Sequence, residues 1–139
     1  MNTVFHVHPA VVHFPIALFV TALVFEAISL GGKKESYHQA AKYVFVFASL
    51  MTPIAVQTGL WELQKYKLHH PVAQFHQNFA YLTLGLSLVA ASLLFFEKRF
   101  PVKFSRFGFF ILLGVIVVCV SAAAYNGGRL VYEYGIGVE

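Results

Sequence analysis

The sequence predicts an all-α polytopic membrane protein, an antiparallel bundle of four transmembrane helices with both termini on the outer side of the membrane. Its 139 residues are 58% hydrophobic and only 12% charged, which is about half the charged fraction of a typical soluble domain. A soluble domain of this size could not bury so much apolar surface. The charges also stand between four long apolar runs, so the expected environment is a lipid bilayer and no nucleic acid partner is expected.

The four apolar runs define the helices in chain order. Roughly 20 apolar residues of helix span a bilayer core, and with polar ends included we expect helices over residues 9–30, 39–63, 71–97 and 105–126. Short connections join them into a single domain over residues 1–139. The first run is not expected to be a signal peptide, because no basic segment precedes it and it is too long.

Proline and glycine mark the expected helix ends. Pro9 and Pro71 stand at first-turn positions, where the missing N–H of proline costs nothing. Gly127-Gly128 is expected to close the last helix, which leaves residues 127–139 as a periplasmic tail. Pro53 falls inside the second helix and is expected to bend it.

Basic residues predict the orientation in the membrane. Seven of the ten Lys and Arg residues lie around the first and third connections, namely Lys33, Lys34, Lys42, Lys98, Arg99, Lys103 and Arg106. The other three are Lys65, Lys67 and Arg129. Because basic loops stay in the cytoplasm, both termini and the middle connection are expected on the outer face, which in a bacterial inner membrane is the periplasmic face.

Histidine is distributed unevenly along the chain. Six of the seven histidines fall at the expected outer ends of the first and third helices: His6, His8, His13, His69, His70 and His76. The two clusters form a faint internal repeat, in which His8-Pro9 precedes His13 and His70-Pro71 precedes His76. His13 and His76 are expected about 6–8 Å inside their helices, so they can approach a flat cofactor from opposite faces.

The chemistry of these two imidazoles favours haem b, with His13 and His76 as axial ligands. Neutral imidazole binds iron well and needs no neighbouring carboxylate or thiolate. Gly59 would let the flat face of the haem approach a helix, and Arg129 is expected to meet the propionates. The predicted role is membrane electron transfer, and a quinone-linked oxidoreductase activity depends on a quinone site that the sequence does not locate. The residues leave open whether the haem belongs to one chain or to the interface of a homodimer.

Two hypotheses of other classes stay open. The first is a copper or zinc site on the outer face, since clusters of imidazoles bind these metals; its ligands would be His6, His8, His69 and His70, together with His13. The second is a cofactor-free assembly or anchoring subunit, in which the histidines are interfacial polar residues. If the cofactor is haem, substitution of the in-helix pair His13 and His76 is expected to have the largest effect. If the site binds copper or zinc, substitution of the histidines before the helices is expected to have the largest effect.

Two ionisable residues lie toward the expected cytoplasmic side. Glu26 falls near the end of the first helix and is expected to extend toward the interface and pair with Lys34 or Lys42. His38 is expected to be a surface residue. The sequence therefore predicts no chemistry at this side of the bundle.

Both ends of the chain resemble one small bacterial family. The run from His8 to Leu18 reads HPAVVHFPIAL, and the run from Tyr125 to Val138 reads YNGGRLVYEYGIGV. Both are similar to signatures of domain of unknown function 2231, and the resemblance covers the whole chain. It implies a four-helix inner-membrane protein, and because some members are fused to Rieske-type iron–sulfur domains it also implies electron transfer with a Rieske-type or cytochrome partner. The haem is predicted from His13 and His76 and not from the resemblance.

Overall fold

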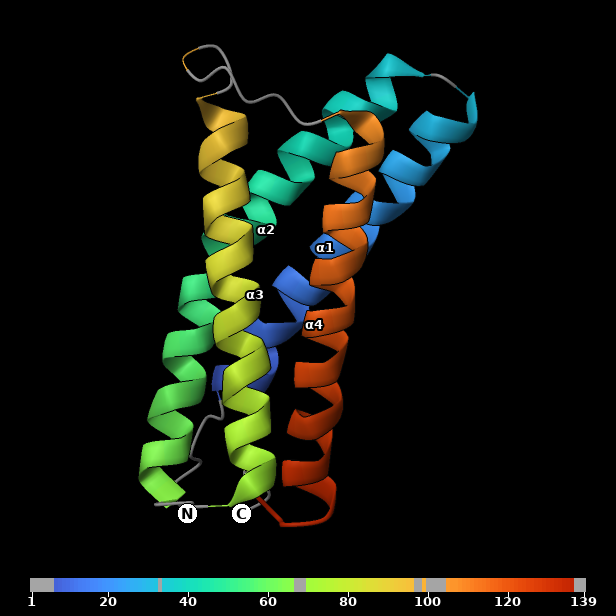
Figure 1. The fold of residues 1–139 in the computed structure, drawn as a ribbon. Helices are drawn as coiled ribbons and strands as arrows, with labels where there is room; N and C mark the ends of the chain where they lie inside the picture. Colours follow the sequence, from blue (N-terminus) through green and yellow to red (C-terminus); the bar gives the residue numbers. More distant parts are fainter. Residues whose placement is uncertain (1–6, 33, 67–69, 97–98, 100–104, 137–139) are drawn as a thin grey trace.

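The computed structural model describes residues 7–32, 34–66, 70–96, 99 and 105–136. These segments contain four helices and no strand: α1 (Val7–Gly32), α2 (Glu35–Tyr66), α3 (Pro71–Phe95) and α4 (Arg106–Tyr132) (Figure 1). All four are long and apolar enough to cross a membrane. The predicted all-α fold of four membrane-spanning helices is confirmed.

The helices run antiparallel in chain order and form a bundle (Figure 1). Each helix packs against two neighbours, because α1 contacts α2 and α4, and α3 contacts the same two helices. Helices α1 and α3 therefore lie diagonally across the bundle. We call the end that holds the first turns of α1 and α3 and the last turns of α2 and α4 the histidine end, and the other the opposite end.

The expected end of the last helix is wrong. Gly127-Gly128 does not close it, and α4 continues to Tyr132, so the predicted tail at 127–139 begins later. Gly135, with a φ of 66°, is the left-handed residue after the helix. The Gly135 N–H donates to the Val131 carbonyl at 3.1 Å and the Ile136 N–H to the Leu130 carbonyl at 3.0 Å. The bond from Gly135 to Val131 is that of an αL motif, so the chain leaves the helix where a left-handed glycine satisfies a carbonyl of the last turn.

The core of the bundle is aromatic at its centre. Phe19, Phe45 and Phe109 have no exposed surface, and the Phe45 ring centroid lies 5.7 Å from that of Phe19 and 5.5 Å from that of Phe109. Small residues at Ala48 and Ala55 on α2 are buried as well, which lets neighbouring helices approach closely. The core joins all four helices, since Ala90, Ala91 and Leu94 of α3 belong to the same cluster.

The burial pattern reveals an internal repeat, in a register that differs from the predicted one. The buried positions Pro15, Phe19, Ala22 and Glu26 of α1 have buried counterparts 68 residues later on α3, at Thr83, Ser87, Ala90 and Leu94. The same offset relates buried positions of α2 and α4, including Phe45 with Leu113, Thr52 with Val120 and Ala55 with Ala123. The predicted repeat aligned His8 with His70, whereas this register aligns His8 with His76. The fold is thus two similar helical hairpins, α1–α2 and α3–α4.

Candidate functional site

Two imidazole rings meet at the histidine end of the bundle. His8 on α1 and His76 on α3 have ring centroids 6.2 Å apart and ring planes 85° apart. Because α1 and α3 lie on a diagonal, the two side chains reach across the space between α2 and α4. Since they are equivalent in the internal repeat, each hairpin contributes one ring.

The hydrogen bonds of His8 fix which ring nitrogen carries a hydrogen. His8 Nδ1 lies 3.1 Å from Thr58 Oγ1, and the Thr58 hydroxyl donates its hydrogen to the Ala55 carbonyl at 2.9 Å. The hydroxyl oxygen therefore accepts from His8, and Nδ1 carries the hydrogen. The Ala55 backbone also interacts with the His8 ring. When the ring is neutral, its lone pair is therefore on Nε2.

His76 is held in the same form by α4. Its Nδ1 lies 2.7 Å from the Ala123 carbonyl oxygen, and because a carbonyl only accepts, Nδ1 carries a hydrogen, which leaves Nε2 as the metal-binding nitrogen of the neutral ring. Ala55 and Ala123 are equivalent in the repeat, so the histidine of each hairpin contacts the backbone of its own hairpin at the same position of the repeat. A bond from one ring nitrogen to a backbone carbonyl is the usual arrangement around histidines that bind a metal through the other nitrogen.

Two glycines make room for the rings. A Cβ at Gly59 on α2 would lie 2.9 Å from His8 Cε1, and a Cβ at Gly127 on α4 would lie 3.1 Å from His76 Cε1. These glycines are also equivalent in the repeat. The prediction that a flat group approaches the backbone at Gly59 was made for haem, and the group that contacts it in this structure is an imidazole. Gly127, expected to end a helix, instead provides space inside one.

His13 is not the residue that faces His76. It is exposed on α1, and its Nδ1 bonds the Pro9 carbonyl within the same helix. Five residues of helix separate it from His8, which turns its side chain by about 140° around the axis. In the repeat His13 corresponds to Tyr81, which is also exposed. The predicted pairing of His13 with His76 is therefore replaced by His8 with His76.

The remaining predicted site residues have other roles or lie elsewhere. The Arg129 guanidinium hydrogen-bonds the Glu133 carboxylate at 2.9 Å and 3.0 Å, and this bond lowers the pKa of the exposed Glu133. His70 caps α3, since its Nδ1 accepts the Val72 N–H at 3.2 Å, and its ring lies 4.5 Å from the Tyr134 ring. His6 and His69 lie outside the described residues.

A buried ionisable pair at the opposite end was not predicted. Glu26 has no exposed surface, and its two carboxylate oxygens lie 2.9 Å and 2.8 Å from His38 Nδ1. The His38 side chain is only 12% exposed, and its ring lies edge-on to Phe109, with centroids 6.0 Å apart. The expectation of a surface residue at His38 is therefore wrong. Both residues lie within two turns of the connection between α1 and α2, and a hairpin places such positions side by side.

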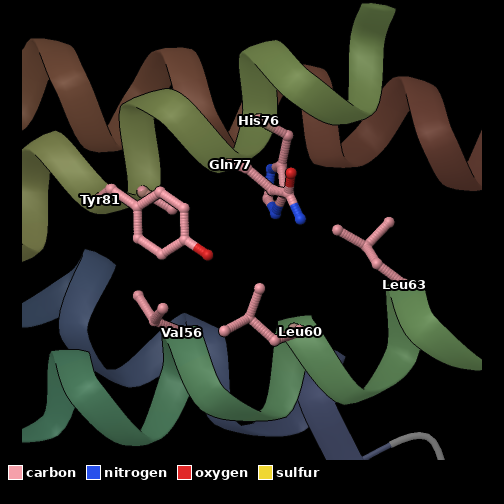
Figure 2. A pocket seen from close by; sticks show the side chains of 8 residues that line it. Val56, Leu60, Leu63, His76, Gln77 and Tyr81 are labelled. Carbon is pink, nitrogen blue, oxygen red and sulfur yellow. The ribbon is translucent and has the colours of Figure 1, made fainter. Parts of the chain in front are cut away.

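A groove between α2 and α3 lies beside His76. Figure 2 shows its walls, formed by Val56, Leu60 and Leu63 on α2 and by Gln77 and Tyr81 on α3. The Tyr81 hydroxyl and the Gln77 amide point into the groove (Figure 2). The groove thus combines apolar walls with two polar side chains next to one of the paired imidazoles.

A second, apolar cavity of about 50 Å³ lies between the four helices and also contacts His76. Residues that are equivalent in the repeat line it from both hairpins, among them Ala55 and Ala123, and Thr52 and Val120. The cavity therefore lies where the two hairpins face each other.

The fold and the site together define a multi-pass membrane protein in which two halves of the chain each present one imidazole to a shared interior. The chain belongs to the family described as predicted membrane protein, domain of unknown function 2231, whose model matches residues 5–139. This match confirms the resemblance that the runs at both ends of the sequence predicted. No curated protein and no solved structure matches the chain.

Proposed function

We propose that the protein is a b-type cytochrome-like electron-transfer protein, with haem b bound between α1 and α3 and His8 and His76 as its axial ligands. The observation that supports this proposal is the His8–His76 pair, with ring centroids 6.2 Å apart and both Nε2 lone pairs available. The two rings lie edge to face in this structure, so a haem would have to enter between them, and the pair supports the proposal because each hairpin supplies one imidazole at the same end of the bundle.

Two imidazoles suffice for haem because the porphyrin supplies the other four iron ligands. Zinc and copper(II) sites take three or four protein ligands. Within the described part of the chain, no third His, Cys, Asp or Glu joins His8 and His76 in a metal-binding group. The ligand number therefore favours haem over the alternative of copper or zinc, for which His6 and His69 would have to supply further ligands.

The shape of the bundle gives haem a place to enter. The cavity of about 50 Å³ beside His76 is smaller than a porphyrin, so binding requires helices to separate. Helices pack more extensively within each hairpin, α1 on α2 and α3 on α4, than between the hairpins. Because each hairpin carries one ligand, haem would enter between the hairpins, where separation disturbs the least packing.

When bound, the haem supplies a one-electron redox couple. His8 and His76 would hold its iron from the two hairpins, and a haem held by two protein imidazoles would favour electron transfer over chemistry on a further iron ligand. The excess of basic residues at the opposite end supports an orientation in a bacterial inner membrane with the histidine end facing the periplasm. The partners proposed for that end are the membrane quinone pool and a Rieske-type or cytochrome protein.

A visible difference spectrum tests the proposal. The full chain, expressed with ample haem supply and purified in detergent, is expected to show sharp α and β bands after reduction with dithionite. A haem-free protein under these conditions would contradict the proposal. Metal analysis of that same sample would then separate a copper or zinc protein from a cofactor-free subunit.

Filling the space beside His8 is expected to weaken haem binding. In Gly59→Ala the new Cβ would lie 2.9 Å from His8 Cε1, so the ring must shift. Such overpacking costs roughly 1–3 kcal/mol, which would weaken haem binding by about 5- to 160-fold. Haem titration of the haem-free protein measures the effect. Gly85→Ala is the matched control, because a Cβ there meets nothing within 4 Å. Equal haem affinities in the two variants would argue against His8 as a ligand.

A further inference from the structure

A wide groove lies between α2 and α3 at the opposite end of the bundle, away from the paired imidazoles. Toward this end α2 leans away from α3 (Figure 1), and the groove between the two helices has a volume of about 430 Å³. Ligand pockets in proteins typically have volumes of about 300–1,000 Å³, so the groove is large enough for an organic molecule. We call it the Lys42 groove, after the basic residue that lines it.

The walls of the Lys42 groove are mostly apolar. Val46, Phe47 and Leu50 line it on α2, and Leu94 and Phe95 line it on α3. Phe47, Leu50 and Phe95 are more than half exposed, and both helices are candidate membrane spans. In a membrane the groove therefore opens to the lipid, and its walls suit an acyl chain.

The end of the groove nearest the connection between α1 and α2 is polar and basic. Gln39 and Lys42 line this end, and both side chains are half-buried. Lys42 follows Glu35, the first residue of α2, by about 10 Å along the helix axis. A lysine near the end of a membrane helix extends its amine toward the interface, which is where the phosphates of lipids lie.

The charges around this end favour an anion. The exposed Glu35 carboxylate accepts hydrogen bonds from Gln39 and Arg106, and it also interacts with Lys42. The described residues of this end nevertheless carry a net positive charge, with Lys34, Lys42, Arg99 and Arg106 against Glu26 and Glu35. A ligand that brings a negative charge to Lys42 is therefore complementary to this end of the bundle.

The polar end of the groove occurs in only one half of the internal repeat. Gln39 and Lys42 correspond to Phe107 and Phe110 on α4, so the packing of a hairpin does not itself require polar groups at these positions. The amide and the amine are thus features of the first hairpin alone, as a ligand site in one half of the repeat would be.

We infer that the Lys42 groove binds one anionic phospholipid, with an acyl chain along the apolar walls and the phosphate beside Lys42. A zwitterionic lipid would fill the same walls but would bring no net charge to Lys42. A free phosphate would leave the apolar walls without a ligand. The inference does not rest on the proposed function, because His8 and His76 lie at the other end of the bundle.

Lipid titration of the detergent-purified full chain tests this inference, with phosphatidylglycerol and phosphatidylcholine of the same acyl chains as the probes. Native mass spectrometry is expected to show one retained phosphatidylglycerol per chain, bound about fivefold more tightly than phosphatidylcholine, which is the effect of one basic residue near an anionic headgroup. Glycerol phosphate is expected not to compete, since it has no acyl chain. Equal affinities for the two lipids, or glycerol phosphate that binds as tightly as the lipid, would overturn the inference.

Two pairs of variants separate the groove from the rest of the surface. Lys42→Gln is expected to weaken the binding of phosphatidylglycerol about fivefold and to leave that of phosphatidylcholine unchanged. Lys65→Gln, on the same helix at the histidine end, is expected to change neither. Leu50→Trp fills the groove and is expected to weaken the binding of both lipids about fivefold or more. Leu82→Trp is its control, because Leu82 on α3 is 48% exposed and does not line the groove.

Two results with these variants would also overturn the inference. If Lys42→Gln and Lys65→Gln have equal effects, the lipid responds to the overall charge of the chain and not to the groove. If the chain is a dimer that Leu50→Trp converts to a monomer while lipid binding stays the same, the groove holds a second copy of the chain. Light scattering measures the oligomeric state, and Lys42→Gln keeps the inference testable if Leu50→Trp does not fold, since it changes no apolar wall.

Discussion

His8→Ala and His76→Ala are each expected to lose the reduced α and β bands, whereas His13→Ala is expected to keep them. In the neutral form of each ring Nε2 can bind a metal, because Thr58 and Ala123 accept the hydrogen of each Nδ1. His13 bonds its own helix at Pro9 and is exposed. The measurement is the haem content and the dithionite difference spectrum of the three variants beside the unaltered chain.

Loss of haem could also follow from loss of fold, so the ligand role needs a second readout. In His8→Gly and His76→Gly, added imidazole is expected to restore the difference spectrum, since it can occupy the space left by the missing ring. Size-exclusion chromatography and helical circular dichroism should match the unaltered chain. Loss of the bands in His13→Ala together with their retention in His8→Ala would refute this pairing and restore the one predicted from the sequence.

His38→Ala is expected to be the most destabilising single change at the opposite end, costing about 3–5 kcal/mol. It removes the partner of a carboxylate that has no exposed surface, and Glu26 keeps its place among buried side chains. Glu26→Gln should cost less, about 0.5–1.5 kcal/mol, because the amide oxygen still accepts from His38. Equilibrium unfolding of the detergent-solubilised variants gives both values.

The internal repeat suggests a second substitution that should restore the stability lost in His38→Ala. The position equivalent to Glu26 in the second hairpin is Leu94, which is buried without a carboxylate. The double variant Glu26→Leu with His38→Ala is therefore expected to recover most of the stability lost in His38→Ala, as replacement of a buried ion pair by apolar groups often does. If the double variant is less stable than His38→Ala, the pair is not the source of the effect.

The fold followed from the sequence because apolar run length is a direct requirement of the bilayer. Each of the four runs predicted a helix, and four helices were found. The ends of the helices were harder to predict than the helices themselves, because helix ends depend on packing as well as on residue type. Gly127 has the residue type of a helix end, but it lies inside α4 since the neighbouring His76 ring needs the space of a missing side chain.

The sequence singled out His76 for a pair of in-helix histidines but did not pair it with His8. His76 was chosen for its depth in a helix, and the structure places it where another imidazole can face it. His8 was missed as its partner because Pro9 was taken as the start of the first helix, whereas α1 begins at Val7 and includes His8 in its first turn. Whether His8 or His13 faces the bundle interior depends on how α1 is rotated about its own axis. A membrane helix is apolar on its lipid-facing and its protein-facing sides, so its sequence gives little information about that rotation.

The 68-residue repeat makes this chain equivalent to a two-fold symmetric dimer whose subunits have been joined end to end. In a true homodimer every substitution acts at both copies of a position, so no residue can specialise in one copy alone. Fusion removes that constraint. The two halves have stayed alike around the paired imidazoles, where Ala55, Gly59 and their counterparts coincide. They differ at the far end, where Glu26 and His38 correspond to Leu94 and Arg106, so this end has an asymmetry that a dimer of identical chains lacks.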